Sequence, residues 1–385
     1  MNKEQKKKLV KYTNRTADFL LACIISFNIT KFIFGPYATR AVFTGNSTDM
    51  FGEDYDYLLI YYADKLYEAF PNVDFTTLKE HLKDIKVYTN PDITEIAIGN
   101  GNVWGGYDRL NNVISLKDPY NHHVFSHEEL HVACNENYFR TLIKAILGTI
   151  GIKSEMEIVM EGLTEMINGE VFGIDKENNY YGDEVLWARM ICEIVDPNLI
   201  IDAYFKGELN IVFDELRKVA NDKDDPEKLL ALMNKQSKLT NDKNSKGIDI
   251  AACDYEITKC FIEMYFNKIK QDPNIILDDP LADIKVNNCW YLITRSLNSL
   301  YVYEEFSGAK NEYLYFQLCK TLPDELRYKI IDAITAFDGD NYKERYYFLP
   351  EKSTISSWYN SEPLSEKEYL EMIEEEKGYS YQFRP

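Results

Sequence analysis

The sequence predicts an α+β protein with a small mixed sheet and two motif-bearing helices in one lobe, and a mainly α-helical second lobe. Three observations predict this fold. Short runs with strand-like composition cluster between residues 85 and 116, two patterned helices follow them, and the rest of the chain is mostly helical in pattern. A chain of 385 residues that is 45% hydrophobic also exceeds the usual size of a single domain, so two lobes are expected.

The elements are expected in a definite order. Helices over residues 57–70 and 76–83 precede strands over 85–89, 95–98, 103–108 and 113–116, and the last two strands can pair as a hairpin. Gly105-Gly106 in the third strand indicates either a close backbone approach or a bulge, and the pattern does not decide between them. A helix is expected to begin near residue 118, and later helices are expected near residues 138–147, 154–168, 184–195, 248–270, 290–306, 311–320, 323–337 and 366–376.

Two polar stretches, 221–226 and 240–246, flank a short helix and mark the best domain boundary. The predicted organisation follows from this boundary. It comprises an N-terminal basic and apolar segment (1–50), a domain that carries the motifs (51–220), a polar linker region (221–247) and a helical C-terminal domain (248–385).

The strongest motif is His127-Glu128-Glu129-Leu130-His131, which has the pattern HExxH. Histidines four residues apart lie on one face of a helix and can both bind a zinc ion. The glutamate after the first histidine can take a proton from a metal-bound water, so Glu128 is the candidate general base. Asp118-Pro119 provides an N-cap and a favoured first helical residue, which predicts that this helix begins there.

A second helix supplies the third predicted ligand. It is bracketed by a capping box, Ser154 with Glu157, and by a stop at Asn168-Gly169. Glu161 lies on its polar face, thirty residues after His131 (161 minus 131), and would complete a His, His, Glu set with one open position.

Two neighbours of Glu161 support this assignment. Gly162 would let the helix approach its neighbour closely. Glu165, one turn further on, is placed to accept the free ring N–H of a ligating histidine. The alternative is that the carboxylates of this helix form a solvated acidic face.

In these residues the chain resembles the zincin metallopeptidases, specifically the gluzincin branch, in which a second helix bearing a glutamate ligand follows HExxH. His127, Glu128, His131, Glu161 and Glu165 each match a position of that pattern, and the resemblance covers roughly residues 84–200. It implies a zincin-like catalytic lobe, one Zn²⁺ ion, and a peptide or protein substrate bound along a sheet edge near residues 103–107.

The chain departs from the gluzincin pattern in one respect. Many gluzincins place a histidine or tyrosine beyond the third ligand to stabilise the oxyanion, and here no histidine follows His131. Tyr181 is the predicted replacement, with Tyr180 and Arg189 as the other candidates.

Two neighbours of the HExxH residues need a separate interpretation. His123 is one turn before His127 but about 12 Å along the helix from His131, so the three histidines cannot share one ion. It is expected to line the cleft or to form a local hydrogen bond. Glu129 is expected to face away from the metal into solvent.

Composition limits the partners and the compartment. A net charge of -20 argues against nucleic acid and anionic membranes. Seven cysteines without paired spacing indicate reduced thiols, Cys134 among them, and a cytoplasmic protein. The basic residues before 16 and the apolar run 19–30 leave export or membrane anchoring through residues 1–35 as the alternative. The oligomeric state has no signal in the sequence.

The sequence therefore predicts a zinc metallopeptidase with His127, His131 and Glu161 as ligands, Glu128 as base and Tyr181 as oxyanion donor. The intact Glu128 favours this reading, because a scaffold needs the ligands but not the base. The alternatives are a non-catalytic zinc-binding regulatory or interaction protein on a zincin framework, and a helical protein with a fortuitous HExxH.

Overall fold

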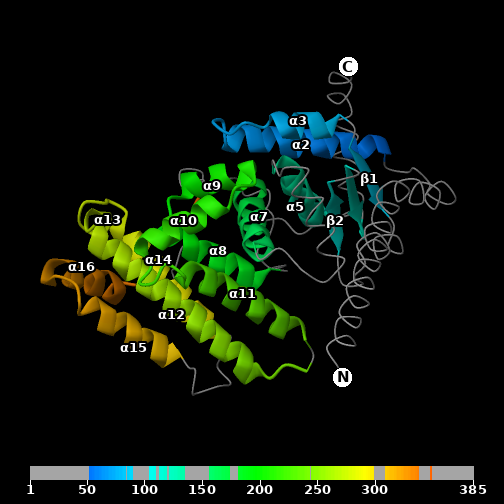
Figure 1. The fold of residues 1–385 in the computed structure, drawn as a ribbon. Coiled ribbons are helices and arrows are strands. Elements are labelled where there is room, and N and C mark those ends of the chain that lie inside the picture. The colour runs from blue at the N-terminus through cyan, green and yellow to red at the C-terminus, as the bar shows by residue number, and fades with distance from the viewer. Residues whose placement is uncertain are drawn as a thin grey trace, which may run out of the picture.

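The computed structural model describes residues 52–83, 85–89, 104–109, 112–118, 121–134, 156–173, 181–242, 244–298, 308–337 and 347–348. These residues form a mainly helical fold with a small three-stranded mixed sheet, as the α+β prediction expects (Figure 1). The predicted N-terminal segment, the strand at 95–98 and the helices at 138–147 and 366–376 lie outside the described residues.

The sheet has the strand order β1-β3-β2, with β1 at Lys86–Thr89, β2 at Gly105–Asp108 and β3 at Val113–Leu116. β3 runs parallel to β1 and antiparallel to β2, so the predicted hairpin is present. Asn112 closes the hairpin with a left-handed φ of 52°, a conformation that asparagine tolerates. Gly105 and Gly106 pair in regular register with Leu116 and Ser115, which excludes a bulge.

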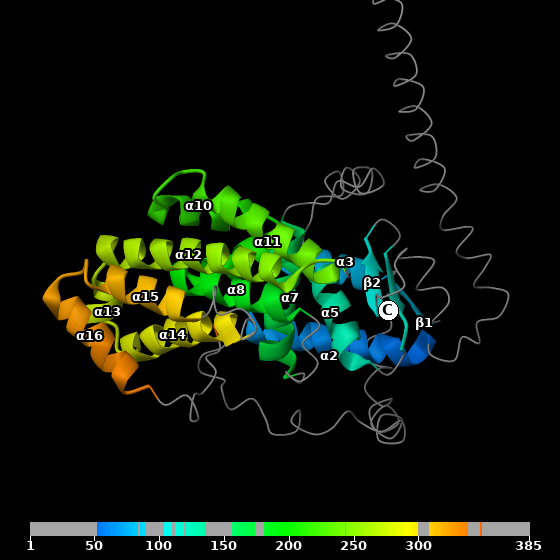
Figure 2. The same ribbon diagram turned by 90° about the horizontal axis from the view of Figure 1, so that it is seen from below.

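α2 (Gly52–Ala69) and α5 (His122–Ala133) contact the sheet, and α3 (Thr76–Leu82) packs on α5. α2 and α3 precede the sheet in the chain, and α5 packs on β2 and β3. α5 lies between the sheet and α7 (Glu157–Phe172) in both ribbon views (Figures 1 and 2). The HExxH helix is therefore enclosed on two sides, which explains why most of its residues are buried.

Of the three predicted boundaries of the motif-bearing helices, two need correction, and the third, the capping box at Ser154, lies outside the described residues. α5 begins after Asn121, whose side chain accepts the N–H of Val124 at 3.0 Å, while Asp118 forms a turn whose carbonyl accepts the N–H of Asn121. α7 does not stop at Asn168-Gly169 but continues to Phe172, where Gly173 takes the left-handed cap with φ 67°. Asn168 is instead fully buried against α5.

Most of the later helices fall on predicted ones, but three of those that follow, at residues 197–206, 210–219 and 274–277, were not predicted. The later helices are α8 (Gly182–Ile194), α9 (Pro197–Lys206), α10 (Asn210–Val219), α11 (Asp225–Asn241), α12 (Gly247–Gln271), α13 (Asn274–Leu277), α14 (Ala282–Asn298), α15 (Gly308–Cys319) and α16 (Asp324–Thr335). α14 begins at Ala282, before its predicted start at residue 290, and α15 begins at Gly308, before its predicted start at residue 311.

The segment predicted as a polar linker region is largely helical. α11 spans 17 residues of it and buries Leu229, Leu230 and Met233. These residues belong to one hydrophobic core that extends from Leu58 to Tyr347. The helical part therefore packs continuously with the motif-bearing part across residues 221–247, and the division into separate domains stays a prediction.

The cysteines of the described segments are all buried thiols outside any disulfide, as expected for reduced core thiols: Cys134, Cys192, Cys253, Cys260, Cys289 and Cys319. Cys134 donates to the carbonyl of Tyr204 at 2.9 Å, which supports its structural interpretation. Among the described residues, no helix combines the length and the apolar character needed to cross a bilayer.

Candidate metal centre

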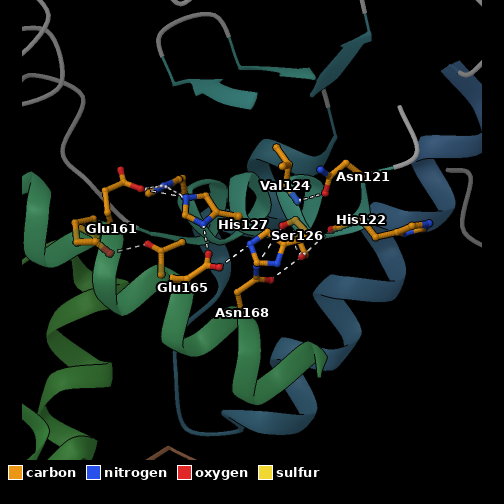
Figure 3. A network of polar contacts seen from close by, with 12 residues as sticks. Asn121, His122, Val124, Ser126, His127, Glu161, Glu165 and Asn168 are labelled. Atoms are coloured by element: carbon orange, nitrogen blue, oxygen red, sulfur yellow. Dashed lines mark hydrogen bonds and ion pairs between the residues drawn. The ribbon is translucent and has the colours of Figure 1, made fainter. Parts of the chain in front are cut away.

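α5 and α7 bring the three predicted ligands together, and Figure 3 shows two of them, His127 of α5 and Glu161 of α7. Nε2 of His127 lies 3.2 Å from Nε2 of His131 and 3.1 Å from Oε2 of Glu161. The distance from Nε2 of His131 to the same carboxylate oxygen is 3.5 Å. The two imidazoles come from successive turns of α5, and Glu161 reaches them from the facing side of α7.

This donor set could hold a metal ion. One ligand atom from each of the three residues lies within 4.8 Å of the others. Two imidazole nitrogens and one carboxylate oxygen, with a fourth position open, form a set typical of catalytic zinc sites. The side chain of His127 is only 6% exposed, whereas His131 and Glu161 keep 20% and 23% exposed, so the group is reachable from one side.

Glu165 fixes the orientation of His127. Its Oε2 lies 2.9 Å from Nδ1 of His127, the contact that the sequence predicts for one of the ligating histidines. Burial opposes ionisation of Glu165, but hydrogen bonds from His123 and His127 outweigh it and lower the pKa of this carboxyl to about 2. An ionised carboxylate only accepts hydrogen bonds, so Nδ1 of His127 carries a proton toward Glu165, which would leave the lone pair of Nε2 for a bound metal.

Glu128 lies between α5 and the sheet. Glu128 is only 7% exposed, and its carboxylate accepts the backbone N–H of Tyr107. Burial raises the pKa of Glu128, and the adjacent His127 and His131 oppose that shift. A carboxylate with raised pKa beside a histidine pair is suited to taking up and returning a proton.

Gly105 allows this arrangement. A side-chain carbon at Gly105 would collide with Cγ1 of Val124 and would lie 3.2 Å from Oε1 of Glu128. Of the two interpretations of the glycine pair, the close approach is therefore the correct one for Gly105.

Tyr181 lies at the centre, at the N-terminus of α8. Its ring stacks on that of His127, with centroids 5.3 Å apart. Gly162, which follows Glu161 on α7, lets α8 approach this closely. A side-chain carbon at Gly162 would collide with the backbone carbonyl of Glu184 on α8. Of the other candidates for the oxyanion donor, Tyr180 lies outside the described residues, and Arg189 interacts electrostatically with Tyr347.

One prediction about the neighbours of the HExxH residues is wrong. Glu129 is not solvated but fully buried, and its burial raises its pKa well above the usual range. α5 has sheet on one side and helices on the other, so its far face is also enclosed. His123 has a partner on another helix, because its Nε2 lies 2.6 Å from Oε1 of Glu165 on α7.

Sequence reasoning thus missed His123 as a partner of Glu165. A signal was present, because His123 precedes His127 by the same four residues that separate Glu161 from Glu165.

Comparison of the chain with family models, curated proteins and solved structures gives no match.

Proposed function

We propose that this protein is a zinc-dependent metallopeptidase of the gluzincin type that hydrolyses peptide bonds. One observation carries the proposal: His127, His131 and Glu161 offer three ligand atoms within 4.8 Å of one another, directly beside the carboxylate of Glu128. Structural stabilisation alone does not require a glutamate base next to a three-ligand set with an open position.

The residues around the centre have separate roles in this proposal. Zinc, when bound, supplies a Lewis acid that activates water and polarises a carbonyl group. Glu128 takes the proton from the attacking water and returns it to the leaving amine. Tyr181 donates from its hydroxyl to the developing oxyanion. Burial, followed by the charges of Glu161 and Glu128, raises the pKa of Tyr181, so the hydroxyl keeps its proton at any working pH.

The edge strand offers a place for the substrate backbone. The N–H of Lys117 donates to the carbonyl of Trp104 at 2.8 Å, so Trp104 and Lys117 form a hydrogen-bonded pair of the ladder. In an antiparallel pair such residues alternate, and Gly105 and Tyr107 therefore turn their backbone groups away from β3. The outward N–H of Tyr107 is taken by the carboxylate of Glu128, so this side of β2 borders the proposed base, and the outward groups of Gly105 are the ones with which an added peptide strand would pair.

The proposal is tested by removing and restoring the metal. The full-length protein is treated with a zinc chelator, dialysed and assayed on an unfolded protein substrate before and after addition of one equivalent of Zn²⁺. Chelation should abolish cleavage and zinc should restore it, whereas Mg²⁺ should not. A protein that binds zinc firmly but cleaves nothing would support the non-catalytic alternative instead.

A further inference from the structure

The carboxylate of Glu165 is held between two histidines of α5. Its Oε2 lies 2.9 Å from Nδ1 of His127, and its Oε1 lies 2.6 Å from Nε2 of His123. The side chains of His123, Glu165 and His127 are 12%, 4% and 6% exposed, so water contributes little to this chain of contacts. Figure 3 shows Glu165 pointing from α7 toward α5.

Matching helical periods produce this arrangement. His123 and His127 are one turn apart on α5, and Glu161 and Glu165 are one turn apart on the facing side of α7. The two helices run in opposite directions here, so Glu161 meets His127 and His131, and Glu165, one turn later on α7, falls between His127 and His123, one turn earlier on α5.

The next turn fixes the register of the two helices. Oγ of Ser126 donates to Oδ1 of Asn168 at 2.6 Å, and Nδ2 of Asn168 lies 3.2 Å from the backbone carbonyl of His123. The backbone that carries His123 is thus tied to the helix that carries Glu165. This buried pair makes the contact between His123 and Glu165 a fixed feature of the packing.

The contact has a consequence for the metal position. A buried carboxylate that loses one of two hydrogen-bond donors is left with a desolvated, unsatisfied oxygen. Such a carboxylate turns away from its remaining partner or takes up other contacts. Either response would release the ring of His127 from the orientation that aims Nε2 at His131 and Glu161.

We propose that His123 is a positioning residue of the metal centre, whose Nε2–H holds Glu165 in place against Nδ1 of His127. The inference rests on the proposed function in requiring a metal at His127, His131 and Glu161, but it does not require peptidase activity. His123 binds neither the metal nor the substrate, and it acts only through Glu165.

The test measures zinc affinity by competition with a chromogenic chelator. His123→Leu removes the donor and should weaken zinc binding by about 10- to 100-fold. His123→Gln places an amide N–H near the position of Nε2 and should restore affinity to within about threefold of wild type. His122→Gln is the matched control, because His122 lies next in the chain and bonds to Tyr62 at 3.2 Å instead. It should bind zinc as wild type does.

A double-mutant cycle separates positioning from general loss of structure. In a Glu165→Ala background, His123→Leu should cause no further loss of zinc affinity, because its only route to the metal is gone. Circular dichroism of the metal-free variants shows whether each one folds. Wild-type affinity in His123→Leu, failure of His123→Gln to rescue, or additive losses in the cycle would each overturn the proposal. A wild-type protein that binds no zinc would refute the metal centre itself, which is a different result.

Discussion

The ring of Tyr181 lies parallel to the ring of His127, with an interplanar angle of 6° and 5.3 Å between centroids. Tyr181 is the residue before α8, and α8 approaches α7 beside a metal-ligand candidate. The phenol is therefore fixed by two helices at the metal position. This position is the reason we propose the hydroxyl of Tyr181 as the oxyanion donor.

Tyr181→Phe should lower kcat by about 10²- to 10³-fold, the usual cost of removing one oxyanion donor. Because phenylalanine keeps the stacked ring, zinc content and KM should change little. Steady-state kinetics on a peptide substrate together with metal analysis check both parts. Tyr107→Phe is the control, since its hydroxyl bonds to Asn112 and His81 instead. Equal kcat in wild type and Tyr181→Phe would remove Tyr181 from the mechanism.

Glu161→Ala should lose zinc, because two histidines alone hold the ion poorly. Metal analysis after dialysis against a weak chelator should find about one equivalent in wild type and almost none in this variant. Glu157→Ala removes an exposed carboxylate from the first turn of the same helix and should retain the ion. Full zinc occupancy in Glu161→Ala would show that the third ligand has been assigned wrongly.

The two glycines of α7 should respond to alanine in opposite directions. At Gly162 an added carbon collides with the carbonyl of Glu184, so Gly162→Ala should destabilise the protein by about 1–3 kcal/mol through overpacking. At Gly169 an added carbon meets nothing within 4 Å, so Gly169→Ala should stabilise it by about 0.5–1 kcal/mol. Urea denaturation measures both. Equal effects would mean that the close approach of α7 and α8 is not fixed by Gly162.

Asp254→Asn should stabilise the protein above about pH 4, the ordinary range for an aspartate. Asp254 is 4% exposed on α12, and burial followed by the charge of Asp183 raises its pKa well above that range, although Gln236 opposes the shift with a hydrogen bond. The folded state thus holds this proton more tightly than the unfolded state. Its contribution to stability is full below the unfolded pKa and is lost as pH rises through the folded pKa.

Asparagine at position 254 does not titrate, so the variant does not lose this stability as the pH rises. The melting temperature of Asp254→Asn should exceed that of wild type at pH 7 and match it near pH 3. Asp249→Asn, an exposed position on the same helix, is the control. A gain that does not depend on pH would contradict the buried-carboxylate explanation.

The local parts of the site could be predicted from the sequence. Four-residue spacing places His127 with His131, and Glu161 with Glu165, because helical periodicity alone decides which residues share a face. The hairpin of β2 and β3 followed in the same way from two strand patterns joined by a short connection. These features depend on residues close together in the chain.

The parts that depend on packing could not be predicted. Asn168-Gly169 resembles a helix stop, but Asn168 bonds to Ser126 of α5 and the helix continues. Glu129 was expected in solvent because the sequence does not show that α5 is enclosed on both sides. The partners of Gly162 and His123 likewise lie on other helices, Glu184 on α8 and Glu165 on α7.

The central claim is most directly tested by incubating the zinc-loaded wild-type protein with a diverse peptide library and identifying products by mass spectrometry. Glu128→Gln is the matched control, because it should keep zinc while losing the base. We expect products from wild type only, with a side-chain preference visible in the same data. Identical spectra for wild type and Glu128→Gln, with zinc bound in both, would contradict the assignment of this protein as a peptidase.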